Sequence, residues 1–324
     1  MSAIAVREAI RDAIAHEMRQ NNKVFLIGEE VGEYEGAYKV SQGLLDEFGP
    51  DRIVDTPITE AGFTGLAVGA AMKGLKPLVE FMTWNFAMQA IDHIINSAAK
   101  TFYMSGGKIN IPIVFRGPNG RASRVAAQHS QDYSAWYSHV PGLKVLSPFD
   151  SSDAYCLMKS AIRDANPVIF LEHELMYNEK FILEENNEYL NIGKARIMLD
   201  GSDITIIAYS RAVETALKVA NTLKDKNIYA EVINLRSLKP LDKNTIIKSV
   251  KKTNKVIIIE EAWKQSGVAS EVLSIIIENA FDYLDAEPIR FCGKEVPLPY
   301  AENLEKNSFP NSDEIIKKCL DICL

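Results

Sequence analysis

The chain has 324 residues, of which 47% are hydrophobic and 24% are charged, and its formal net charge is −7. This length exceeds the roughly 100–200 residues of a typical domain, so two domains with separate hydrophobic cores are expected. An acidic chain without a basic tract lacks the positive surface that neutralises nucleic-acid phosphates, which argues against that class of protein.

Short β-branched runs alternate with helical segments along the chain. Strands are predicted at 24–27, 53–55, 78–81, 113–115 and 168–171, and helices at 61–74, 85–104 and 151–164. The alternation stops at a polar, asparagine-rich stretch and resumes with strands at 204–207, 230–235, 256–259 and 289–291 and helices at 211–226, 266–279 and 312–323. We therefore predict an α/β fold with two parallel-sheet domains, at 1–186 and 201–324, joined by a linker at 187–200.

The cysteines and the apolar runs indicate the environment of the chain. Cys156, Cys292, Cys319 and Cys323 form no CxxC pair, which favours a reducing compartment over a disulfide framework or a zinc site. No apolar run approaches the roughly 18 residues of a membrane span, and the first ten residues resemble neither a signal nor a transit peptide. We expect a cytoplasmic, bacterial protein that contacts neither membrane nor nucleic acid.

Open α/β sheets bind their ligands at the carboxyl ends of strands, so the segments after three predicted strands, 56–62, 82–89 and 116–133, are candidate ligand sites. Glu60 begins a helix that contains Gly65 and Gly69, although a glutamate in a first turn also complements the helix dipole. The stretch 81–89, which contains several aromatic residues, is typical either of a core or of a pocket for a flat heterocycle. His129 lies in a long loop and could exchange protons near neutral pH or serve only as a hydrogen-bonding residue.

Several motifs are missing from the sequence. There is no G-x-G-x-x-G after a predicted strand, no G-x-x-x-x-G-K-[ST] and no G-x-S-x-G. These absences argue against a Rossmann dinucleotide site, a P-loop and a hydrolase nucleophile elbow.

Long strings of the sequence closely resemble the beta subunits of pyruvate dehydrogenase, which depends on thiamine diphosphate. They are DTPITEAGF at 55–63, YMSGG at 103–107, VFRGPNG at 114–120, AQHSQ at 127–131, EVINLR at 231–236 and VPLPYA at 296–301. The resemblance implies a transketolase-like pyrimidine-binding domain and a transketolase C-terminal domain, in a heterotetramer of two alpha and two beta chains.

The resemblance assigns roles to four residues. Glu60 matches the carboxyl that hydrogen-bonds a ring nitrogen of the cofactor's aminopyrimidine, where a donated proton favours the tautomer that generates the carbon nucleophile. Phe86 matches an aromatic residue against the pyrimidine, and Met82 matches a residue of the pocket wall. His129 matches an active-site histidine that faces the bound intermediate and helps position the lipoyl group.

Two metal ions are also implied. The family holds magnesium and the diphosphate through a Gly-Asp-Gly motif on the alpha subunit, and this chain contains no Gly-Asp-Gly. A structural potassium ion is expected on carbonyl and other oxygens, which suit a hard cation. Its implied ligands are Ile113, Ala161, Ile162, Asp164 and Asn166.

The expected reaction is oxidative decarboxylation of pyruvate with reductive acetylation of the lipoyl group of the dihydrolipoyl acetyltransferase core. A branched-chain 2-oxo acid or acetoin dehydrogenase is the nearest alternative, although the strings at 82–86 and 116–120 favour pyruvate. A non-catalytic scaffold subunit and a free-standing thiamine enzyme are the remaining alternatives.

Overall fold

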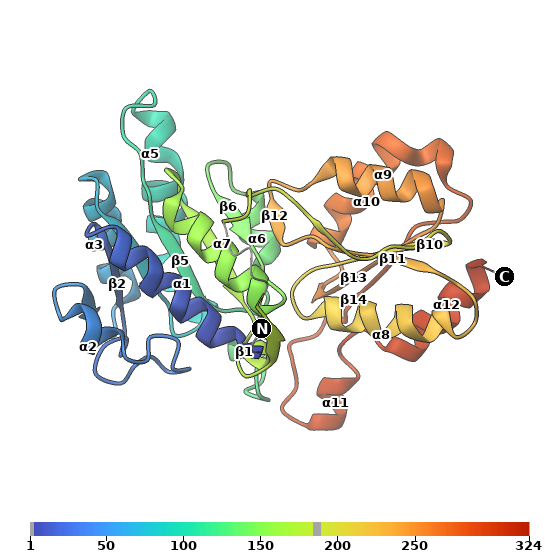
Figure 1. Cartoon of the computed structure of the whole chain (residues 1–324), viewed down its shortest axis with the longest axis horizontal. Helices are drawn as coiled ribbons and strands as arrows, with labels where there is room; N and C mark the ends of the chain where they lie inside the picture. Colours follow the sequence, from blue (N-terminus) through green and yellow to red (C-terminus); the bar gives the residue numbers. More distant parts are fainter. Residues whose placement is uncertain (1–2, 184–188, 324) are drawn as a thin grey trace. The chain divides into compact units, whose positions relative to one another are not determined.

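The computed structural model describes residues 3–183 and 189–323, and the chain divides into two compact units (Figure 1). Unit 1 comprises Met1–Asn119 and Trp136–Ile192, and unit 2 comprises Gly120–Ala135 and Gly193–Leu324. Residues 120–135 fall inside the expected first domain, 1–186, but group with unit 2. The reason is local, since their side chains bond to residues of unit 2, as Ser134 does to Tyr209.

Unit 1 is built on a parallel sheet whose strands lie in the order β6-β7-β5-β4-β2-β3. The strands are β2 (Val24–Gly28), β3 (Ile53–Asp55), β4 (Lys76–Glu80), β5 (Val114–Pro118), β6 (Lys144–Leu146) and β7 (Val168–Glu172). Every residue of β5 and β7 is buried, as expected for strands covered on both faces. A short antiparallel pair, β1 (Ala3–Ala5) with β8 (Lys180–Ile182), accompanies this sheet.

Helices follow most strands of unit 1. They are α1 (Val6–Gln20), α2 (Leu44–Phe48), α3 (Glu60–Met72), α4 (Trp84–Ala87), α5 (Ala99–Met104) and α7 (Ser151–Arg163), with the 3-10 turns η1 (Met88–Ala90) and η4 (Glu174–Met176). The 3-10 turn η3 (Ala127–His129) belongs to unit 2, and helix α6 (Ser134–His139) begins in the last two residues of 120–135 and continues into unit 1. The predicted helix at 85–104 is present as an unbroken helical run over 84–104, although its type changes along the run from α4 through η1 and the π-helix η2 (His93–Ala98) to α5. Helices α1 and α7 pack side by side and bury Ile10, Ile14 and Leu157 in the core.

Unit 2 contains a second sheet in the order β14-β13-β10-β11-β9. Strands β10 (Ile204–Ala208), β11 (Ala230–Asn234), β13 (Val256–Trp263) and β14 (Ile289–Gly293) are parallel, and β9 (Arg196–Leu199) pairs antiparallel with β11. The other elements are α8 (Ala212–Lys224), β12 (Ser237–Lys239), α9 (Lys243–Thr253), α10 (Val268–Ala280), η5 (Phe281–Tyr283), α11 (Glu302–Lys306) and α12 (Ser312–Cys323). Strand β9 lies within the expected linker 187–200, of which residues 187 and 188 are outside the described residues.

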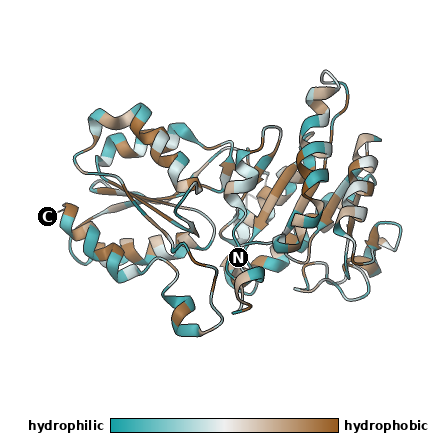
Figure 2. Cartoon of the chain, turned by 180° about the vertical axis from the view of Figure 1, so that it is seen from behind, coloured by the Kyte–Doolittle hydropathy of each residue, from teal (hydrophilic) through white to brown (hydrophobic). Residues whose placement is uncertain are grey.

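Hydropathy follows this architecture. Figure 2 shows hydrophobic residues concentrated in the strands of both sheets, while the helices alternate between hydrophilic and hydrophobic stretches. That alternation is what a helix needs when one face packs on a sheet and the other meets water. Within residues 3–183 and 189–323, none of the helices combines the length and the apolar character needed to cross a membrane.

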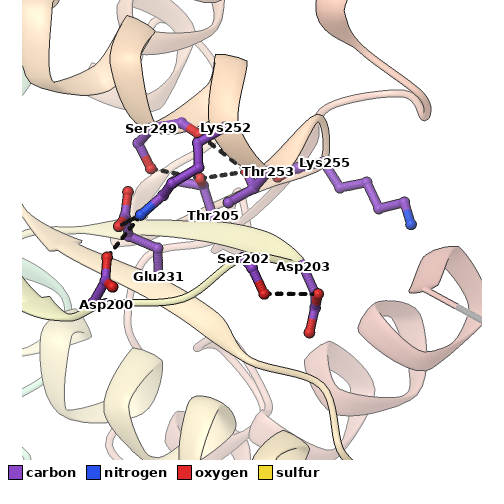
Figure 3. A network of polar contacts seen from close by, with 9 residues as sticks. All are labelled: Asp200, Ser202, Asp203, Thr205, Glu231, Ser249, Lys252, Thr253 and Lys255. Carbon is purple, nitrogen blue, oxygen red and sulfur yellow. Dashed lines mark hydrogen bonds and ion pairs between the residues drawn. The ribbon is translucent and has the colours of Figure 1, made fainter.

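A polar network stabilises unit 2 around the start of β10 (Figure 3). The buried carboxylate of Glu231 on β11 pairs with Lys252, whose Nζ also lies 2.7 Å from Asp200. Nearby, the hydroxyl of Thr205 is 2.6 Å from that of Ser249. A carboxylate as buried as that of Glu231 requires such a partner, because ionised groups are costly to remove from water.

Candidate functional site

Glu60 is placed by the turn that joins β3 to α3. The strand ends at Asp55, and Glu60 is the first residue of the helix, at the carboxyl-end edge of the sheet. Its side chain is only 3% exposed, and its Oε2 has no hydrogen-bond partner among the described residues. A buried carboxyl oxygen without a partner is costly, so this oxygen is available to a further hydrogen-bonding partner.

Glu29 lies beside Glu60, and our sequence interpretation did not include it. It directly follows β2, the strand paired with β3, so both carboxyls emerge at the same edge. Glu29 is 6% exposed, and its Oε1 also has no hydrogen-bond partner among the described residues. Burial, and then the neighbouring charge of Glu60, raise the pKa of Glu29 to about 7. The pair can therefore hold a proton at neutral pH.

A buried ionic cluster supports the same edge. The guanidinium of Arg116 on β5 lies between Glu80 on β4 and Glu172 on β7, with Nε 2.6 Å from Glu172 Oε1. The hydroxyl of Tyr177 donates to Glu172 at 2.7 Å. Burial raises the pKa of Glu80, although the charge of Arg116 opposes the shift. The cluster links three neighbouring strands, β4, β5 and β7, near their carboxyl ends, where the loops with the candidate site residues begin.

Met82 and Phe86 follow β4, at the edge where Glu29 and Glu60 lie. The stretch between them contains both core and accessible residues: Phe81 and Trp84 are fully buried, with ring centroids 5.5 Å apart, whereas Met82 and Phe86 are half-buried. Thr83 caps α4 by accepting from the backbone N–H of Asn85 at 3.3 Å. Two partly accessible hydrophobic side chains thus follow a strand at the same edge of the sheet as the carboxyl pair.

His129 belongs to unit 2, whereas Glu60, Met82 and Phe86 belong to unit 1. It is exposed in η3, and its backbone N–H donates to Ala126 O at 3.2 Å. Of the four residues expected to contact the cofactor or the bound intermediate, three therefore lie in unit 1 and His129 lies in unit 2.

The residues expected to bind potassium all lie in unit 1, near the end of α7 and the start of β7. Their oxygens already have partners: Ile162 O accepts from Lys76 Nζ at 2.7 Å, and Asp164 pairs with Lys144. Asp164 also accepts from the backbone N–H of Asn166 at 2.9 Å. This corner attracts positive charge, but two ammonium groups already compete for its oxygens.

The expected potassium residues also include Ile113 and Ala161. The carbonyl of Ile113 accepts from Val168 N at 2.9 Å, and that of Ala161 accepts from Asp164 N at 3.2 Å. Each carbonyl oxygen has a second lone pair that remains for a cation. Across residues 3–183 and 189–323, no group of three or more His, Cys, Asp or Glu side chains is arranged to hold a metal ion.

Known proteins match the whole chain. The family models for the transketolase pyrimidine binding domain and the transketolase C-terminal domain match residues 2–180 and 193–315. Over 320 residues the chain is 59% identical to the pyruvate dehydrogenase E1 component subunit beta of Rickettsia felis, which covers 99% of this chain and 98% of that protein.

More distant proteins share the same plan. The mitochondrial pyruvate dehydrogenase E1 component subunit beta-2 of Oryza sativa subsp. japonica is 56% identical over 324 residues, covering 99% of this chain and 86% of that protein. A solved split gene transketolase, described as an inactive beta4 tetramer, matches with a TM-score of 0.81 at 22% identity over 100% of both chains. The predicted pair of transketolase-like α/β domains is confirmed.

Proposed function

This chain belongs to the pyruvate dehydrogenase E1 component beta subunits of the transketolase family, and on that premise we propose that it supplies one half of a thiamine-diphosphate site. The observation that carries the proposal is the buried, unpartnered Oε2 of Glu60 beside Glu29. A carboxyl in this setting suits proton donation to a ring nitrogen. Thiamine diphosphate, when bound, would supply a carbon nucleophile and an electron sink, which is the chemistry that decarboxylation of a 2-oxo acid needs.

The chain's own residues orient the cofactor and move protons. With the cofactor bound, Glu60 would hydrogen-bond its aminopyrimidine ring nitrogen and pass a proton to it, and Glu29, whose pKa is raised to about 7, would keep a proton within the pair at neutral pH. Met82 and Phe86, half-buried at the same edge, supply hydrophobic contacts to the ring. The magnesium ion and the diphosphate are assigned to an alpha subunit, because this chain has no Gly-Asp-Gly.

The balanced reaction consumes pyruvate, a lipoyl disulfide and one proton. Carbon dioxide leaves, one sulfur receives the acetyl group as a thioester, and the other becomes a thiol. His129 is assigned to orient the lipoyl group and deliver that proton, since imidazole exchanges protons near neutral pH. The enzyme would be a heterotetramer of two alpha and two beta chains that serves a dihydrolipoyl acetyltransferase core in the bacterial cytoplasm.

Potassium is part of the proposal as a structural ion. The oxygens of Ile113, Ala161, Ile162, Asp164 and Asn166 supply a donor set of the kind that a hard cation prefers. Lys76 and Lys144 already bind two of these oxygens, so potassium must compete with their ammonium groups.

The direct test is Glu60→Gln in the reconstituted alpha–beta enzyme. Glutamine keeps the size of the side chain but removes its acidic proton, so we expect an assembled tetramer with decarboxylation reduced by about a hundredfold or more. Full activity would favour a scaffold role. The same enzyme should use pyruvate more efficiently than 3-methyl-2-oxobutanoate, and the reverse order would favour a branched-chain substrate.

A further inference from the structure

The loop that carries His129 has a strained backbone. Its two ends are closed by Gly120 N donating to Gln131 O at 2.9 Å. Between them, Arg124 and Ala126 have φ angles of 56° and 65°, a left-handed region that costs energy for residues with a Cβ. A conformation of this kind persists only where surrounding contacts enforce it.

The end of this loop is fixed by buried hydroxyl groups. Ser134 Oγ lies 3.0 Å from the hydroxyl of Tyr209, which donates to Glu260 Oε2 at 3.2 Å. All three residues are buried in unit 2. These bonds lie on the C-terminal side of His129, whereas the strained residues Arg124 and Ala126 lie on its N-terminal side.

Arg121 fixes that first half. Its Nη2 lies 3.2 Å from Glu305 Oε2, and its guanidinium carbon is 4.5 Å from the centroid of the Phe309 ring. The side chains of Arg121 and Glu305 are only 19% and 4% exposed. A pair removed from water to this degree, with an aromatic ring over the cation, is much less screened than a surface ion pair.

The anchor is itself held on the sheet of unit 2. Glu305 lies on α11, and Ser308, just after this helix, accepts from Lys294 N at 2.9 Å. Lys294 directly follows β14. The partner of Arg121 is therefore connected to the end of a sheet strand by a backbone hydrogen bond.

A neighbouring ion pair provides a contrast. Arg124 Nη1 lies 3.3 Å from Glu302 Oε2, but both side chains are 55% exposed. Exposed pairs contribute little because water and salt screen them. The two arginines lie three residues apart in one loop and pair with the same short helix, α11, but of the two only Arg121 makes a largely buried ion pair.

We propose that Arg121 is a positioning residue for His129, holding the loop through Glu305 and Phe309 so that the imidazole meets the lipoyl group. The proposal rests on the function assigned to His129 above. Removing the guanidinium leaves the Glu305 carboxylate buried without its ion partner and frees the strained half of the loop. Misplacement of about 1 Å suffices to slow a transfer that depends on orientation.

The test compares Arg121→Gln with Arg124→Gln, the matched control, in the assembled and cofactor-loaded alpha–beta enzyme. Two rates are measured: pyruvate decarboxylation with ferricyanide as oxidant, and reductive acetylation of a lipoyl domain. For Arg121→Gln we expect kcat/KM for the lipoyl domain to fall about tenfold, with the ferricyanide rate within about twofold of wild type. Arg124→Gln should change neither rate by more than about twofold, and Arg121→Lys should restore part of the loss.

His129→Gln separates this proposal from the function on which it rests. If His129→Gln slows lipoyl acetylation and Arg121→Gln does not, the positioning role is overturned while the role of His129 stands. If His129→Gln leaves lipoyl acetylation intact, both fail. An equal loss of both rates in Arg121→Gln indicates general destabilisation and also overturns the proposal.

A second variant covers the case in which Arg121→Gln fails to assemble. Phe309→Leu removes the ring without removing charge and should slow lipoyl acetylation selectively; unchanged rates in that variant would overturn the proposal.

Discussion

Glu29 allows a direct test of the buried carboxyl pair, because glutamine mimics its protonated form. Burial and the charge of Glu60 raise the pKa of Glu29 from 4.5 to about 7. A tenfold change in proton affinity is worth about 1.4 kcal/mol, so ionising Glu29 costs up to about 3 kcal/mol more in the folded chain than in the unfolded chain.

The direction of the shift determines the sign of the effect. Well below pH 4.5 Glu29 is protonated in both the folded and the unfolded chain, so its ionisation does not contribute to the difference in free energy of unfolding between wild type and Glu29→Gln. As the pH rises from about 4.5 to about 7, the unfolded wild type releases this proton before the folded wild type does, so the wild type loses stability that the variant keeps. Above about pH 7 the difference levels off at up to about 3 kcal/mol.

The assay is guanidinium unfolding of the alpha–beta enzyme without cofactor, at about pH 5 and about pH 8. Glu33→Gln is the control, since Glu33 is exposed on the same loop. The difference between Glu29→Gln and wild type should grow with pH, while the control stays flat. A difference that is the same at both pH values would refute the claim that Glu29 is ionised at a cost.

Three further perturbations test other parts of the structure. Lys252→Met leaves the buried carboxylate of Glu231 without its ion partner, so the free energy of unfolding measured with guanidinium should fall by about 2 kcal/mol. An unchanged unfolding midpoint would contradict a stabilising role for the network in Figure 3. Gly142→Ala places a Cβ 2.0 Å from the carbonyl oxygen of Ala99 at a φ of +94°, so we expect about 3 kcal/mol of destabilisation or loss of soluble protein. Lys76→Met removes an ammonium group that competes for Ile162 O. Replacing sodium chloride by potassium chloride should therefore raise the melting temperature more in this variant than in wild type. Equal responses of the two proteins would argue against a potassium site there.

The fold was predictable because its signals are local. Continuous β-branched runs identify strands buried on both faces, and the fully buried β7 shows the reason for such a run. The start of α3 at Glu60 also agrees with the sequence to within one residue. The change of helix type within 85–104 was not predictable, since the π-helix η2 has the same apolar pattern as an ordinary helix.

The sequence by itself determined the two-domain α/β class and drew attention to Glu60, because strand runs, helix starts and family strings are each read over a few consecutive residues. Only the tertiary structure brought Glu29 against Glu60, through the pairing of β2 with β3 across an intervening loop and helix. Only the tertiary structure joined 120–135 to unit 2 and β9 to its sheet. Pairings between distant segments depend on which surfaces bury each other, and no local pattern records that choice.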